Sequence, residues 1–144
     1  MLKGIPRILS PELMKILMEM GHGDEIVLAD SNFPAASCAR KLVRADGHAM
    51  LDLLDAILAF FPIDTYTAYP VTLMQVVPGD PMPAIWEKYR QILIHHGIQI
   101  SKLGFVERMA FYEKARQSYA IVATGEESLY ANIVLKKGVI EAAR

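Results

Sequence analysis

Hydrophobic residues recur along this chain with two spacings, one typical of helices and one typical of buried strands. Over residues 11–20 the apolar side chains fall at helical spacing, behind Ser10, a residue type that caps helices, and ahead of Gly21, a type that ends them. The next stretch, Glu25 to Asp30, is mostly apolar and does not alternate. Because a strand covered on both faces has this pattern, the region predicts a helix, a turn and a buried strand.

The same two spacings continue to the end of the chain. They predict further helices over residues 50–61, 83–96 and 108–118. They predict further strands over residues 41–45, 69–77, 98–103, 120–124 and 131–136. Helices that alternate with strands are typical of an α/β three-layer sandwich with a largely parallel central sheet. A length of 144 residues fits a single domain spanning residues 1–144.

Composition adds an expectation about assembly. Hydrophobic residues make up 53% of the chain, above the roughly 45–50% of typical soluble proteins. Since one core leaves part of this apolar surface uncovered, we expect a homo-oligomer. The net charge is −1, from 15 basic and 16 acidic residues. This balance gives no reason to expect nucleic acid or an anionic membrane as a partner.

Cysteine content and hydropathy bear on the compartment. The chain has a single cysteine, Cys38, which excludes an internal disulfide and suits a reducing environment. No apolar run approaches the roughly 20 residues of a membrane span, and the first residues have no apolar core of signal-peptide length. We therefore expect a cytoplasmic protein with no membrane association.

Two residues bracket the predicted buried strand at its ends. His22 lies between two glycines, and its imidazole titrates near neutrality, so it is a candidate general acid or base. Asp30 follows the strand, at the edge where sheets of this class bind ligands, and its carboxylate can accept hydrogen bonds from ligand hydroxyls. The alternatives are a surface histidine in a helix-terminating turn and a capping aspartate.

A second polar cluster lies in the last third of the chain. Arg108 precedes an aromatic pair, and Tyr130 and Asn132 lead into the last predicted strand. Residues two apart in an extended chain face the same way, so this phenol and amide are candidates for binding sugar hydroxyls, with Arg108 available nearby. The alternative is that Tyr130 packs in the core and Asn132 caps the strand.

The histidine and glycine patterns give no sign of a metal or a nucleotide. His48, His95 and His96 have no further ligand types around them at metal-binding spacing. The glycines match neither of the common phosphate-binding fingerprints. We therefore expect no metal site and no cofactor.

Several short blocks, in order, make the chain resemble the fucose mutarotase and ribose pyranase family. The resemblance covers Met1 to about Val139. Its blocks are Ser10 to Leu13, Glu19 to Ile26, Asp30 with Phe33-Pro34, Arg44 to Gly47, Ala110 to Glu113, Thr124 to Glu126, Tyr130 to Ile133 and Lys136 to Val139. Residues 62–102 match poorly. Asn32 and Met109 also depart from the fucose-type pattern, which often has a histidine and an aromatic residue there.

The resemblance implies an isomerase that interconverts the α and β anomers of a free reducing sugar without a cofactor. L-fucose is the sugar that the resemblance favours. It implies that His22 is the catalytic residue and that Asp30, Arg108, Tyr130 and Asn132 bind the sugar. It also implies a ring-shaped homo-oligomer, commonly a decamer, with sites at subunit boundaries. Two alternatives remain open. One is a D-ribose-type pyranase, which exchanges pyranose and furanose rings, and the other is a non-catalytic monosaccharide-binding module.

Overall fold

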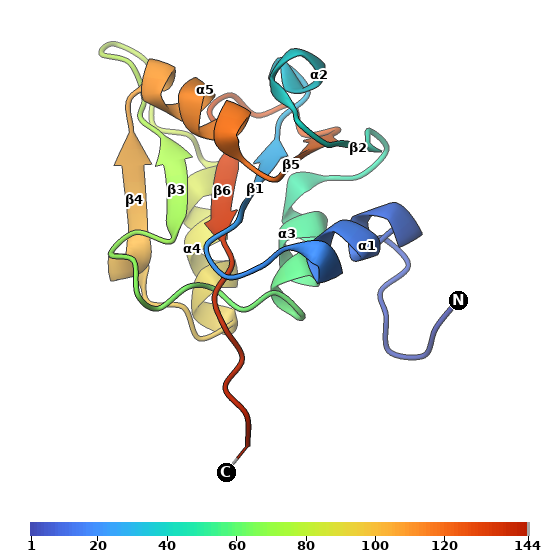
Figure 1. Cartoon of the computed structure of the whole chain (residues 1–144). Helices are drawn as coiled ribbons and strands as arrows, with labels where there is room; N and C mark the ends of the chain where they lie inside the picture. The colour runs from blue at the N-terminus through green and yellow to red at the C-terminus, as the bar shows by residue number, and fades with distance from the viewer. Residues whose placement is uncertain (144) are drawn as a thin grey trace.

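A mixed sheet in the order β2-β5-β1-β6-β3-β4 forms the centre of the structure (Figure 1). The computed structural model describes residues 1–143. Its strands are β1 (Glu25–Ala29), β2 (Leu42–Ala45), β3 (Val71–Met74), β4 (Leu103–Val106), β5 (Ala120–Thr124) and β6 (Ile133–Lys136). Its helices are α1 (Pro11–Glu19), α2 (Ala35–Cys38), α3 (Met50–Leu58), α4 (Ile85–His95) and α5 (Arg108–Gln117), with a 3₁₀ turn over Ile100–Lys102.

Within the sheet, only β6 runs against its neighbours in the part of the chain that the structure describes. Strand β1 pairs in parallel with β5, which pairs in parallel with β2, and β3 pairs in parallel with β4. Strand β6 lies between β1 and β3 and is antiparallel to both. The carboxyl ends of the other strands and the beginning of β6 therefore meet at one edge of the sheet. We call this the carboxyl edge and the opposite one the amino edge.

Helices cover both faces of the sheet, which confirms the predicted α/β sandwich. The packing of strand β1 on both faces explains why its sequence does not alternate between apolar and polar residues. On one face, Ile26 and Leu28 pack with α1, α3 and α4. Val27 and Ala29 point to the other face and pack with α2 and α5. These four side chains are buried, so positions 26–29 of the strand need apolar residues, whereas Glu25 at its start is only half-buried.

The predicted start of the first helix is confirmed. The side chain of Ser10 accepts a hydrogen bond of 3.1 Å from the backbone N–H of Leu13, and Pro11 occupies the first helical position. None of the helices within residues 1–143 combines the length and the apolar character needed to cross a membrane.

The prediction of a strand over residues 98–103 is wrong for most of its length. The backbone N–H of Ile98 donates to the carbonyl of Leu93, which closes the end of α4, and Lys102 donates to Gln99 within a tight turn. These local bonds occupy groups that a strand would offer to a neighbour, so β4 begins only at Leu103. The four-residue helix α2 was not predicted, because four residues are too few to show a helical period.

Candidate active site

His22 lies in a rigid turn at the amino edge, between α1 and β1. Gly23 adopts a φ of 87°, a conformation that favours glycine, and its N–H donates to the carbonyl of Lys137 over 2.8 Å. The side chain of Asp24 accepts a hydrogen bond of 2.8 Å from the N–H of Gly21. The turn is thus tied to the end of β6, and the imidazole of His22 projects from a fixed backbone with 46% of its side chain exposed.

A buried carboxylate holds this imidazole. Nε2 of His22 lies 3.0 Å from Oδ1 of Asp64, whose side chain is only 2% exposed. The other oxygen of Asp64 accepts hydrogen bonds from the backbone N–H and the hydroxyl of Thr67. The backbone N–H of Tyr66 donates to Oδ1. Asp64 is thus fixed by its own loop, and His22 is oriented by Asp64.

The charge of Asp64 decides which nitrogen of His22 carries a proton. Burial alone raises the pKa of Asp64, but the hydrogen bonds from Thr67, His22 and Tyr66 outweigh burial and hold the pKa well below its usual value. An ionised carboxylate only accepts hydrogen bonds, so Nε2 of His22 is the protonated nitrogen. The other nitrogen, Nδ1, keeps a lone pair that can take up a proton from a ligand.

Asp30 and Asn132 meet at the carboxyl edge, at the end of β1 and the beginning of β6. The backbone N–H of Asp30 donates to the side-chain oxygen of Asn132 over 2.8 Å. Oδ1 of Asp30 accepts a hydrogen bond of 3.0 Å from the N–H of Asn32. Asp30 is 5% exposed, and its burial raises its pKa despite hydrogen bonds from Asn32, Phe33 and Ala131. The structure therefore brings together Asp30 and Asn132, two of the predicted site residues.

Two aromatic residues of α4 fix the segment that carries Tyr130. Nε1 of Trp86 donates to the carbonyl of Tyr130 over 2.8 Å, and the hydroxyl of Tyr89 donates to the carbonyl of Ala131 over 2.6 Å. Tyr130 has a φ of 56°, a conformation that residues other than glycine rarely adopt. Such backbone persists where the surroundings hold it in place, and it is common at functional sites.

The side chains of Tyr130 and Arg108 lie at the same edge, one on the loop before β6 and the other at the start of α5. The phenol of Tyr130 donates to Oδ2 of Asp80 over 2.5 Å, and this carboxylate raises the pKa of Tyr130. Arg108 is the first residue of α5, directly after β4, and its guanidinium carbon lies 5.6 Å from the centre of the Tyr112 ring. Arg108 is exposed and therefore available to a ligand.

Two cavities open at the carboxyl edge beside these residues. One has a volume of about 210 Å³, and Asp30, Ser31, Arg44, Asp46 and Thr124 contribute its polar lining. The other has a volume of about 310 Å³ and is lined by Asp80 and Tyr130 among residues 80–85 and 128–130. Carboxylates, hydroxyls and a guanidinium around small cavities suit a ligand rich in hydroxyl groups.

The structure does not bring His22 to the other predicted residues. Asp30, Arg108, Tyr130 and Asn132 gather at the carboxyl edge, whereas His22 lies at the amino edge, at the other end of β1. A five-residue strand spans roughly 17 Å, so the side chains of His22 and Asp30 cannot contact one small ligand within one chain.

Sequence reasoning missed Asp64 and Asp80. Both lie in the region 62–102, where the family resemblance is weakest. One local signal does point to Asp64. An aspartate in a loop often accepts hydrogen bonds from the backbone N–H groups of the next residues, which is called an Asx turn, and Asp64 accepts such bonds from Tyr66 and Thr67. That signal says where the aspartate caps its loop but not that it reaches His22, 42 residues away.

Comparisons with known proteins agree over nearly the whole chain. The RbsD / FucU transport protein family matches residues 3–140. An L-fucose mutarotase of Histophilus somni is 50% identical over 140 residues, covering 96% of this chain and 97% of that protein. The human fucose mutarotase is 47% identical over 146 residues, covering 96% and 94%. The crystal structure of a fucose mutarotase from Streptococcus pneumoniae in complex with L-fucose has a TM-score of 0.96 and 55% identity, covering 97% and 100%.

Proposed function

Because this chain belongs to the RbsD / FucU transport protein family, we propose that it is an isomerase that interconverts the α and β anomers of L-fucose. The observation that carries this proposal is the similarity, over nearly full length, to proteins named fucose mutarotase, at 47–50% identity for the two named relatives. The whole chain, 1–144, acts as one mutarotase-like domain. The proposed ligand, a monosaccharide, suits the polar cavities beside Asp30 and Tyr130.

The reaction consists of proton transfers, which matches the residues available. To open the sugar ring, the bond between the anomeric carbon and the ring oxygen breaks, the ring oxygen gains a proton and the anomeric hydroxyl loses one. The free aldehyde end then rotates, and the ring closes by the reverse transfers onto the other face. One group can take the proton from the anomeric hydroxyl and deliver it to the ring oxygen as that bond breaks, and it makes the same transfers in reverse when the ring closes.

His22 performs this proton transfer through Nδ1. Asp64 holds Nε2 protonated and fixes the ring plane, so the lone pair on Nδ1 faces away from the carboxylate and is free for the sugar. When Nδ1 takes a proton, the imidazole becomes positively charged while Nε2 still donates to the ionised Asp64. Asp64 thus positions His22 without touching the sugar.

The four residues at the carboxyl edge hold the sugar. Asp30 accepts hydrogen bonds from hydroxyl groups, and Asn132 both donates and accepts. Arg108 donates from an exposed guanidinium, and Tyr130 presents its phenol on a backbone that Trp86 fixes. Rigid positioning lowers the entropy cost of bringing the anomeric centre to the proton-transfer group.

Because His22 and Asp30 lie at opposite edges of the sheet, the complete site contains His22 of one copy and the sugar-binding residues of another. A closed ring of copies related by rotation, such as one layer of a decamer, brings unlike edges together at every boundary. The amino edge also has uncovered apolar surface, in a groove of about 280 Å³ beside Met18, Phe60 and Ile140. These three side chains are 78%, 41% and 80% exposed, which suits contact with a second copy.

The location that fits this proposal is the cytoplasm. Cys38 is a buried free thiol, which is the state expected in a reducing compartment.

Saturation-transfer NMR on the anomeric protons of L-fucose tests the proposed activity. Exchange between the two anomers is expected to accelerate with protein concentration, and D-ribose in a parallel series is expected to respond less. Binding of L-fucose without faster exchange would instead show a sugar-binding module. Greater acceleration of pyranose and furanose exchange in D-ribose would identify a pyranase.

A further inference from the structure

Three potential metal ligands come together far from the carboxyl edge, on the outer surface of α3 and α4. Asp55 belongs to α3, His95 is the last residue of α4 and His96 caps that helix. One ligand atom from each lies within 4.8 Å of the others. Nε2 of His96 lies 2.7 Å from Oδ1 of Asp55, and the rings of His95 and His96 lie 5.2 Å apart.

The end of α4 holds the two histidines in place. Gly97 has a φ of 77°, its N–H donates to the carbonyl of Ile94, and the N–H of Ile98 donates to the carbonyl of Leu93. These bonds stop the helix directly after His96. The negative end of the helix dipole lies at this point, which favours a cation.

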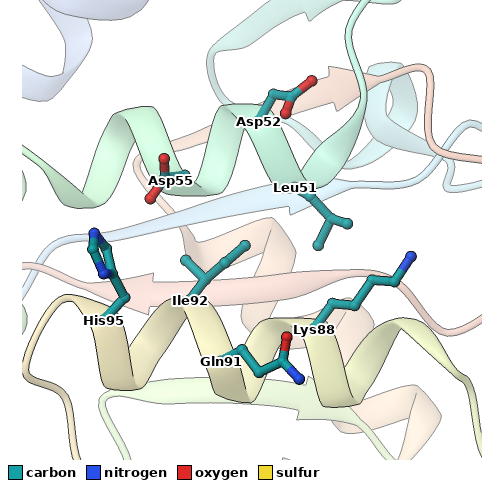
Figure 2. A pocket seen from close by; sticks show the side chains of 7 residues that line it. All are labelled: Leu51, Asp52, Asp55, Lys88, Gln91, Ile92 and His95. Carbon is teal, nitrogen blue, oxygen red and sulfur yellow. The ribbon is translucent and has the colours of Figure 1, made fainter.

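The cluster forms one end of a groove between the two helices. The groove has a volume of about 460 Å³ and is lined by Leu51, Asp52, Asp55, Lys88, Gln91, Ile92 and His95. Figure 2 shows Asp55 and His95 facing each other at one end, with Lys88 at the other end. The ammonium group of Lys88 therefore lies away from the proposed ligands. Asp52 adds a second carboxylate to the groove, on α3 like Asp55.

We propose that Asp55, His95 and His96 bind a divalent transition-metal ion of the zinc type. Two imidazoles and a carboxylate are ligands that zinc, nickel and copper share. Zinc bonds of about 2.0–2.1 Å place tetrahedral ligand atoms roughly 3.3 Å apart. Asp55 and His95 are exposed side chains, so rotation about their side-chain bonds closes the remaining distance from 4.8 Å. Water completes the coordination.

This site is independent of the proposed sugar chemistry. A bound ion would fasten the end of α4 to α3, and α4 carries Trp86 and Tyr89, which position Tyr130 and Ala131. The ion would therefore stabilise the helix behind the sugar-binding segment without touching the sugar.

Isothermal titration of the metal-free protein with zinc chloride tests the proposal. One zinc ion per chain is expected, with affinity reduced at least about tenfold in His95→Ala and in Asp55→Asn, because each loses a ligand. His48→Ala is the matched control, since His48 is exposed and lies outside the cluster. Cobalt as a substitute is expected to give a visible absorption spectrum that both ligand variants weaken.

Two results would overturn the proposal. One is the absence of saturable zinc binding to the unaltered protein. The other is zinc binding whose affinity stays the same in His95→Ala and in Asp55→Asn. If His22→Ala then abolished that binding, the ion would be assigned to the His22 and Asp64 pair instead. All these substitutions fall on side chains exposed to solvent, and circular dichroism would verify that each variant is folded.

Discussion

His22 and Asp64 are 42 residues apart in the chain, yet Nε2 of the imidazole lies 3.0 Å from the buried carboxylate. Asp64 receives further hydrogen bonds from Thr67 and Tyr66, so its position does not depend on His22. The arrangement fixes both the tautomer and the orientation of the His22 imidazole. It is the feature of the structure that best suits His22 to the proton-transfer role proposed above.

Replacing Asp64 with asparagine is expected to slow anomer exchange by about 100-fold, because the imidazole loses the ionised carboxylate that orients it and fixes its tautomer. The KM for L-fucose should change little, since Asp64 does not touch the sugar. Exchange rates measured by NMR over a range of sugar concentrations separate the two parameters. Asp24→Asn, in the turn that carries His22, is the matched control, because an asparagine oxygen can still accept the hydrogen bond from the N–H of Gly21, and it should leave both unchanged. A KM that rises about as much as the exchange rate falls would show that Asp64 binds the sugar.

The lowered pKa of Asp64 also predicts how stability depends on pH. The unfolded chain binds a proton at this carboxyl near pH 3.9, whereas the folded protein binds it only at lower pH. The stabilisation is therefore complete above the unfolded pKa and is lost as the pH falls below it. Urea unfolding of the unaltered protein and of Asp64→Asn should give free energies whose difference is constant above about pH 5 and shrinks steadily as the pH falls below about 4. A difference that stays constant below about pH 4 would contradict this assignment.

The hydroxyl of Tyr89 donates a hydrogen bond to the carbonyl of Ala131 in the core. Tyr89→Phe leaves that buried carbonyl without its donor, so the free energy of unfolding should fall by about 1–3 kcal/mol. Weaker binding of L-fucose should accompany this loss, because Ala131 lies between Tyr130 and Asn132. Tyr66→Phe is a suitable control, since Tyr66 is 76% exposed. Unchanged stability in Tyr89→Phe would rule out the structural role.

The carboxylate of Asp80 disfavours ionisation of the Tyr130 phenol. Asp80→Asn should therefore lower the pKa of Tyr130 toward its usual value of about 10. Titration followed by the ultraviolet absorbance of tyrosinate measures this change, with Tyr130→Phe identifying which part of the signal belongs to Tyr130. If Asp80→Asn leaves the titration curve as it was, the contact does not persist in solution.

Much of the fold follows from local features of the sequence. The capped helix at Pro11 and the strand at Glu25 to Ala29, which is apolar from Ile26 onward, are both present, because each rests on interactions within a few residues. The antiparallel direction of β6 could not be predicted from the sequence. A four-residue apolar strand has the same pattern in either direction, and its direction depends on which strand it pairs with in the folded chain.

The sequence predicted candidate residues for the site but not how they meet. Asp30 and Asn132 were both among these candidates, and the structure joins them across 102 positions. The sequence also predicted that a strand lies between His22 and Asp30, but it could not show that their shared site would need a second copy of the chain. Contacts between distant loops, such as that of Asp64 with His22, leave no periodic pattern in the sequence.

We proposed that His22 of one copy acts on a sugar held by Asp30 of another, and mixing two inactive variants tests this directly. His22→Ala and Asp30→Asn should each lose anomer exchange for L-fucose. When the two are mixed in equal amounts and allowed to exchange subunits, boundaries that combine an intact His22 with an intact Asp30 form by chance at about one quarter of all sites. We predict that NMR will detect about that fraction of the unaltered activity. A mixture that stays as inactive as its two components, although mass spectrometry shows mixed oligomers, would contradict the shared site.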